Sequence, residues 1–112
     1  MRLFDCHTHL DEYSAEEIHS ILERAGHVGV AGAIIAGTTL ASSRRCVDLA
    51  EADPRLFAGV GIHPMDINAS VDDSTWQVLH DLAHSPRVVA ISEVGLDGIG
   101  GAPDYDLQEN VF

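Results

Sequence analysis

The stretch Asp5-Cys6-His7-Thr8-His9-Leu10 decides the fold of this chain, because it places two histidines directly after an apolar, strand-like start. Successive side chains of a strand point to opposite faces, so we expect His7 and His9 to share one face. Cys6 then points to the other face and is not expected to be a ligand. Two imidazoles on one face can bind a single metal ion, and their nitrogens suit zinc, iron and similar ions.

Acidic residues favour a metal site at this pair over the alternative that both histidines are ordinary loop residues. Asp5 and Asp11 flank the pair, and a second acidic motif, Glu93-Val94-Gly95-Leu96-Asp97, follows far downstream. Carboxylates beside imidazoles are the mixed oxygen and nitrogen ligands that many divalent ions accept.

Length and composition predict one domain, residues 1–112, with no internal boundary. A chain of 112 residues has the length of an ordinary domain, and its hydrophobic content of 46% is enough for a core. No apolar run approaches the ~20 residues that cross a bilayer, so we expect no membrane partner. Two cysteines, Cys6 and Cys46, make no disulfide framework, and we expect a reduced, cytoplasmic protein.

The net charge of −12 excludes some functions and leaves others open. The six basic residues are all arginines, so the chain offers no lysine for a Schiff base or a carbamylated metal bridge. This acidity argues against a broad basic groove for nucleic-acid backbones. It does not argue against a metal site, because bound cations offset local negative charge.

Strand-like and helical segments alternate along the chain. Apolar runs at Val30–Ala36, Leu56–Ile62 and Val88–Ile91 are expected to be strands buried on both faces. Helical patterns lie between them, the first capped by Ser14 and Glu17. Alternating strands and helices predict an α/β fold with parallel strands and right-handed crossovers.

Residues able to do chemistry follow each of the four expected strands. In α/β folds, sites form at the carboxyl ends of strands, and in barrels they form there almost without exception. A barrel active site would leave this pattern in the sequence. The residues, in chain order, are His7, His9, Thr38, Thr39, His63, Glu93 and Asp97.

Glu93 is the carboxylate to which we give the most weight. It follows a strand that is expected to be buried, where a carboxylate is costly unless it is paired with an arginine or binds metal. In the second case it could bridge two ions about 3.5–4 Å apart that activate a water. His63 could hold a substrate oxygen or bond to a neighbouring loop. Asp97 could hydrogen-bond a ligand histidine or cap a loop, and Thr38 and Thr39 are expected to be caps.

These motifs together resemble the TatD family of metal-dependent hydrolases. The resemblance extends over essentially the whole chain and about the first two-fifths of a typical member. Gly98 departs from the family pattern, in which an aromatic residue usually follows the Gly-Leu-Asp. The matching segments are Asp5–Asp11, Gly37-Thr38, Gly59–Pro64 and Glu93–Asp97, with Pro103, Gln108 and Phe112 in the segment that opens the next helix.

The resemblance implies the first half of a distorted TIM barrel, with about four parallel strands. It also implies a centre of two divalent ions, for which the ligand set admits Mg, Mn, Zn or Fe. His7 and His9 would bind one ion, and Glu93 would be the catalytic carboxylate shared by both. Two further histidines and an aspartate, which the family supplies from its second half, have no counterpart here.

Three functions follow as expectations. Family members are mostly described as DNases, commonly 3′-to-5′ exonucleases, so the first is metal-dependent hydrolysis of DNA or another phosphoester. The second is hydrolysis of a different ester or amide bond, such as an aminoacyl ester on tRNA. The third is an inactive half-barrel that self-associates, because a sheet of four strands leaves two open edges.

Overall fold

The computed structural model describes residues 1–68 and 71–112, in which four strands form one parallel sheet. The strands follow chain order across the sheet, β1-β2-β3-β4, and each neighbouring pair is parallel. The α/β alternation expected from the sequence is therefore confirmed, although the third strand ends two residues early. The strands are β1 (Leu3–Thr8), β2 (Val30–Ala36), β3 (Leu56–Val60) and β4 (Val88–Ile91).

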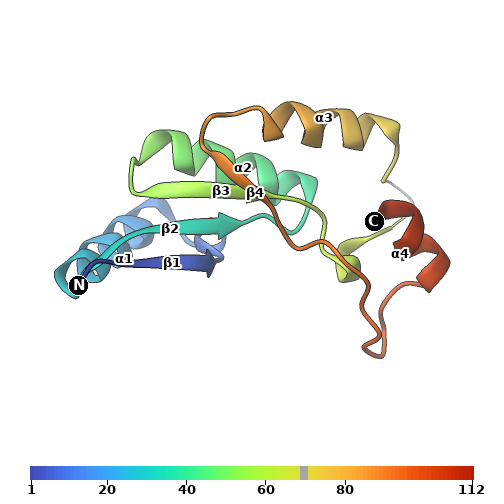
Figure 1. Ribbon diagram of the computed structural model, residues 1–112, viewed down its shortest axis with the longest axis horizontal. Helices are drawn as coiled ribbons and strands as arrows, with labels where there is room; N and C mark the ends of the chain where they lie inside the picture. Colours follow the sequence, from blue (N-terminus) through green and yellow to red (C-terminus); the bar gives the residue numbers. More distant parts are fainter. Residues whose placement is uncertain (69–70) are drawn as a thin grey trace.

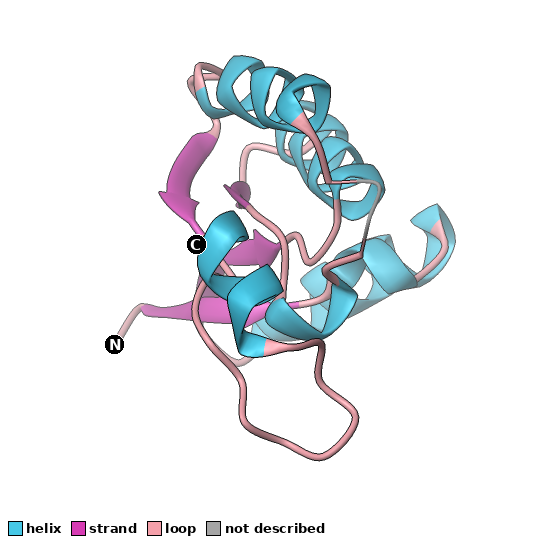
Figure 2. Cartoon of the chain, turned by 90° about the vertical axis from the view of Figure 1, so that its right-hand side faces the viewer, coloured by secondary structure: helices cyan, strands magenta, loops and turns pink. Residues whose placement is uncertain are grey.

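Three helices lie on one side of the sheet, which curves away from them (Figures 1 and 2). They are α1 (Ala15–His27), α2 (Leu40–Ala52) and α3 (Asp73–Ala83). A capping box begins each one, because a side chain at the N-cap and another three residues later satisfy each other's backbone N–H groups. The three boxes pair Ser14 with Glu17, Thr39 with Ser42 and Asp72 with Thr75.

The core lies between the two central strands and α2. Ile35 of β2 and Leu56 of β3 are fully buried, as is Cys46 of α2. Burial, with the charge of Asp11 nearby, raises the pKa of the Cys46 thiol to about 12. Cys46 therefore stays protonated at neutral pH and acts as a small core residue.

The two edge strands differ from this centre. In β4 the side chains of Val89 and Ile91 are 52% and 61% exposed. The expectation that β4 is buried on both faces is therefore wrong for these residues, because only one face meets the helices. Trp76 of α3 is also 38% exposed.

The remaining elements gather at the carboxyl ends of the strands (Figure 1). They are two short 3-10 helices, η1 (Leu10–Glu12) and η2 (Pro64–Asp66), and the helix α4 (Tyr105–Val111), which follows a long loop after β4. Figure 2 views the molecule from this end, with the loop and α4 in front. Within the described ranges no helix is both long and apolar enough to cross a bilayer.

Candidate metal centre

Curvature of the sheet brings together residues from its two opposite edges. One ligand atom each from His7, His9 and Glu93 lie within 4.8 Å of one another. His7 is in β1 and Glu93 follows β4, so two strands separate them in the sheet. In a flat sheet three strand spacings would amount to about 14 Å. The cluster therefore depends on how strongly the sheet curls.

The two histidines converge as strand alternation predicted. The Nε2 atoms of His7 and His9 lie 3.2 Å apart. The Nδ1 of His9 lies 3.0 Å from the carbonyl oxygen of Ala36, the last residue of β2. That carbonyl can only accept, so Nδ1 carries the proton and Nε2 of neutral His9 keeps a free lone pair. A backbone carbonyl that fixes the ring and its tautomer in this way is usual for metal-binding histidines.

Glu93 faces the histidine pair from the other edge. Its side chain is 13% exposed, and its Oε1 lies 2.8 Å from Nε2 of His7 and 3.9 Å from Nε2 of His9. This Oε1 is buried and receives no well-aligned hydrogen bond within the described part of the chain. The ion-pair partners described for Glu93 are histidines, so the arginine pair considered from the sequence is not what the structure contains.

His63 approaches the second oxygen of Glu93. Its Nε2 lies 3.6 Å from Oε2, while the backbone N–H of Met65 donates to its Nδ1 at 3.1 Å. Accepting at Nδ1 leaves the proton of neutral His63 on Nε2, which is then a donor aimed into the site. His63 thus makes the local loop bond that was one of the two alternatives and also faces the cluster, while its contact with a substrate oxygen stays a prediction.

Asp97 makes one of the two contacts that the sequence left open. Its carboxylate accepts from the backbone N–H of Ile99 at 2.8 Å, and no described hydrogen bond joins it to a histidine. The side chain caps the loop, which was the other possibility. The space beside Gly98 is taken by Tyr105, whose hydroxyl would lie 2.7 Å from a Cβ at that position. An aromatic side chain from α4 therefore stands next to the residue that departs from the family pattern.

The two threonines after β2 shape the loop and do not join the cluster. Thr39 is the N-cap of α2, as expected. The carbonyl of Thr38 accepts from the backbone N–H of His63 at 2.8 Å. This bond ties the loop after β2 to the start of the loop that carries His63.

Sequence reasoning did not predict the contacts of two polar residues that hold the site's framework. Ser43 is fully buried in α2, and its hydroxyl contacts the backbone N and O of Gly61 at 3.1 Å. Gln108 is fully buried in α4 and bonds to the loop after β4. A polar residue on the inward stripe of a helix was the available signal, but the sequence alone does not say which loop it meets.

The cluster has the chemistry of a divalent cation site. Two imidazole Nε2 atoms face each other at 3.2 Å beside a buried carboxylate oxygen that lacks a well-aligned donor. Buried polar atoms normally have partners, and a cation bound among these three would satisfy all of them. The residues present therefore fit a metal ion.

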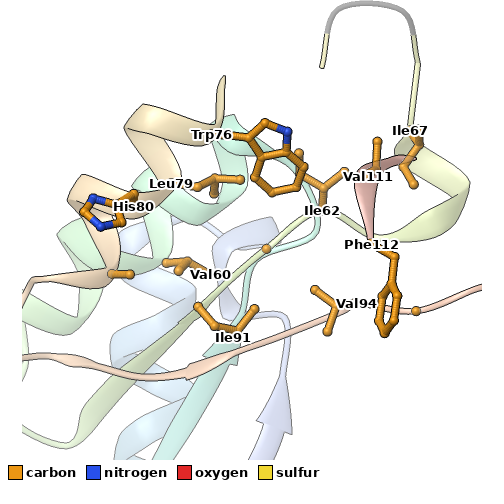
Figure 3. A pocket seen from close by; sticks show the side chains of 13 residues that line it. Val60, Ile62, Ile67, Trp76, Leu79, His80, Ile91, Val94, Val111 and Phe112 are labelled. Carbon is orange, nitrogen blue, oxygen red and sulfur yellow. The ribbon is translucent and has the colours of Figure 1, made fainter. Parts of the chain in front are cut away.

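An apolar pocket nearby is separate from this cluster. It encloses about 200 Å³ between α3, the ends of β3 and β4, and α4. Figure 3 shows Leu79, Ile91 and Val94 around it, with Val111 and Phe112 closing one side. None of its lining residues belongs to the histidine–carboxylate cluster, so it is a packing feature of α4 and not the metal centre.

Comparison with known proteins identifies relatives along nearly the whole chain. A family model described as TatD related DNase matches residues 4–112. The "Uncharacterized metal-dependent hydrolase TatD" of Mycobacterium tuberculosis is 37% identical, over 98% of this chain and 44% of its own length. The "3'-5' ssDNA/RNA exonuclease TatD" of Escherichia fergusonii is 35% identical, over 88% of this chain and 37% of its own length. The chain thus spans less than half the length of these relatives.

Solved structures give the same coverage. The crystal structure of YjjV, a TatD homologue from Escherichia coli K12, superposes with a TM-score of 0.85 at 29% identity, covering 98% of this chain and 43% of that one. A TatD family hydrolase from Entamoeba histolytica superposes with a TM-score of 0.83 at 22% identity, covering 99% and 43%. The expected fold, the first half of this family's barrel, is therefore confirmed.

Proposed function

This chain belongs to the family of TatD related DNases, and on that premise we propose that the protein containing it is a metal-dependent phosphodiesterase that shortens DNA from its 3′ end. The observation that carries the proposal is the convergence of His7, His9 and Glu93 across the curved sheet. Two relatives support it, one whose name specifies metal dependence and one whose name specifies 3′-to-5′ exonuclease activity. Below, the family-length protein means a polypeptide that contains this chain and completes the barrel.

Each of these residues has a role that its contacts suggest. His7 and His9 would hold the ion through Nε2, because Nδ1 of His9 is already engaged by the Ala36 carbonyl. Divalent cations bound at this cluster would supply Lewis-acid activation of water and neutralise charge that develops on the phosphate.

Glu93 is proposed to serve two ions. Its Oε1 faces the histidine pair, whereas its Oε2 faces His63 on the other side. A carboxylate whose two oxygens face different partners suits a shared ligand. His63 presents its Nε2–H at the far side, where it would donate to a non-bridging oxygen of the substrate. The nitrogen and oxygen donors of the cluster accept Mg, Mn, Zn or Fe.

The charge of the chain suggests how the substrate is held. With a net charge of −12, this half of the protein offers no broad basic surface for a duplex backbone. Bound cations would therefore provide most of the attraction for phosphate in this half. Contact with one strand end requires fewer phosphate contacts than binding along a duplex, which favours an exonuclease.

A single assay compares this proposal with its alternative, hydrolysis of another ester such as an aminoacyl ester on tRNA. The family-length protein is incubated with 5′-labelled single-stranded DNA, or with aminoacyl-tRNA, with divalent ions or with a chelator. We expect a ladder of DNA shortened from the 3′ end, lost with the chelator and in His9→Ala. His19→Ala, which removes an exposed histidine of α1, is the matched control and should keep activity. Deacylation of tRNA without DNA shortening would favour the alternative.

A further inference from the structure

The loop that carries Glu93 is fastened by one buried side chain of α4. Gln108 has 0% exposure. Its Oε1 accepts from the backbone N–H of Asp97 at 2.7 Å, and its Nε2 donates to the carbonyls of Asp97 at 3.0 Å and Pro103 at 2.6 Å. The side chain thus engages both backbone groups of Asp97, which lies four residues after Glu93. All three bonds go to the loop, so Gln108 acts as a clamp on it.

The helix that carries Gln108 is itself held in place. Val111 of α4 packs against the core, and together with Phe112 it lines the apolar pocket that Val94 of the loop also lines (Figure 3). Apolar contact therefore fixes α4 beside the loop, and the amide of Gln108 then fixes the loop's backbone. Because the amide is buried, each lost hydrogen bond would leave an unsatisfied backbone group.

The other end of the loop is held against β3. The backbone N–H of Ser92 donates to the carbonyl of Val60 at 3.0 Å. A Cβ on Gly61 would overlap the carbonyl oxygen of Ser92, and a Cβ on Gly59 would lie 2.8 Å from the Ser92 side chain. Gly59 in β3 and Gly61 just after it thus allow a close approach that larger residues would prevent. This fixes the residue immediately before Glu93.

Between these two anchors the backbone of Glu93 adopts an uncommon conformation. Its φ is +57°, in the left-handed region that residues other than glycine seldom occupy. Such a conformation persists only where the surroundings over-determine it, and it is frequent at functional sites. Here the Ser92 contact before it and the Gln108 clamp after it provide that constraint.

We propose that Gln108 is a positioning residue for metal binding, which holds Glu93 toward His7 and His9 by clamping Asp97; this rests on the metal site proposed above. Gln108 touches no ligand atom in the described contacts, so it acts through the backbone from Asp97 to Glu93. The consequence is a metal affinity that depends on a residue outside the cluster.

The test measures binding of Mn²⁺ alone to the family-length protein. Gln108→Met keeps the side chain's length but removes its hydrogen bonds, and Gln108→Glu, when ionised, cannot donate to the two carbonyls. We expect calorimetric titration to show both variants binding Mn²⁺ about 10- to 100-fold more weakly, as when a partner that orients a metal ligand is removed. Raised Mn²⁺ should restore most of the turnover with the substrate KM unchanged.

A matched control separates positioning from general stability. Leu22→Ala removes a buried side chain of α1, which packs on β2, and should destabilise the fold without changing Mn²⁺ affinity. Amide exchange at Asp97 should accelerate in both Gln108 variants and not in Leu22→Ala. Unchanged Mn²⁺ affinity in the folded Gln108→Glu variant, or an equal loss in Leu22→Ala, overturns the proposal. A wild type that binds Mn²⁺ but hydrolyses no DNA refutes the proposed function and leaves this inference standing.

Discussion

The two central strands and the two edge strands of the sheet contrast in burial and in chemistry. In β2 and β3 most side chains are buried, and neither strand contributes to the histidine–carboxylate cluster. In β1 five of six residues are exposed, and β4 alternates between exposed and half-buried positions. Yet β1 carries His7, and Glu93 follows β4. The stabilising contacts therefore lie in the central strands, and the candidate ligands lie in or directly after the edge strands.

This difference shows that the site depends on the sheet's curvature more than on any single strand. The buried strands β2 and β3 stabilise the sheet, and the exposed strands β1 and β4 approach each other only at their carboxyl ends. In the relatives, more than half of the protein lies beyond the region matched by this chain. In a longer protein we expect the remaining part to pack against the open edges of β1 and β4.

The largest effect on folding and activity is expected when the 112 residues are studied alone, without a polypeptide that completes the barrel. Open edges of apolar strands promote association, and exposed side chains such as Val89 and Ile91 would add to it. We expect this polypeptide to self-associate or to fold poorly, and to show no significant metal-dependent nuclease activity. Light scattering, urea unfolding and a metal-supplemented DNase assay measure these properties. If the 112 residues form a monomer that unfolds cooperatively and cleaves DNA like the family-length protein, the open edge strands do not limit stability or activity and this prediction is wrong.

The second prediction concerns the negative charge of Glu93, which follows the edge strand β4. Glu93→Gln in the family-length protein keeps the side-chain shape but loses the carboxylate between the histidine pair and His63. Two cations would then repel each other with less compensation. We expect hydrolysis to fall by about 10²-fold or more, as when a main electrostatic element of an active site is lost. Normal turnover with an intact circular dichroism spectrum would exclude the shared-ligand role.

The third prediction concerns metal content. Elemental analysis of the family-length protein should find about two divalent ions per chain, the number that a paired centre holds. His7→Ala and His9→Ala should lower this content, because each removes a nitrogen donor from the cluster. His19→Ala, at an exposed position on α1, should leave it unchanged. Unchanged content in both site variants would refute the ligand assignment.

The fourth prediction compares the stability that a central strand and an edge strand each provide. Leu56→Ala, in the fully buried centre of β3, should lower the free energy of unfolding by about 2–5 kcal/mol. Val89→Ala, exposed here on β4, should cost about 1.5 kcal/mol in the family-length protein, because completing the barrel covers its two methyl groups. Urea unfolding of both variants tests this. A near-zero cost at Val89 would mean that this face stays open in the longer protein.

The sequence predicted the fold better than it predicted the contacts of the site. Apolar runs and capping residues located the strands and helices because these signals are local, as at Ser14 and Glu17. Strand alternation likewise predicted the convergence of His7 and His9. For Asp97 the sequence left two alternatives, of which the structure contains the loop cap. The clamp by Gln108 was not predictable, since it depends on how a loop and a later helix meet in space. The exposure of Val89 and Ile91 in β4 was missed because an apolar run does not reveal whether both faces of its strand are covered in the fold.

The smallest effect is expected at the opposite end of the sheet, where the strands begin. Arg55, one residue before β3, donates to Asp53 at 2.7 Å and to Glu23 at 2.9 Å. Its hydrogen bonds hold the pKa of Asp53 below the ordinary value of 3.8. Because the folded pKa is lower than the unfolded one, this stabilisation is complete above the unfolded value and is lost as pH falls through the folded value.

Asp53→Asn should therefore lower the free energy of unfolding of the family-length protein by only about 0.5–1 kcal/mol near neutral pH, as partly exposed ion pairs do. The difference from wild type should shrink below about pH 4, where Asp53 of the wild type also becomes protonated. Asp48→Asn, an exposed residue of α2, removes the same charge without touching Arg55 and serves as the control. Urea unfolding across this pH range supplies the measurement, and Mn²⁺ affinity should not change. A loss of Mn²⁺ binding in Asp53→Asn would contradict the separation between the ends of the sheet, because no described contact links Asp53 to the metal cluster.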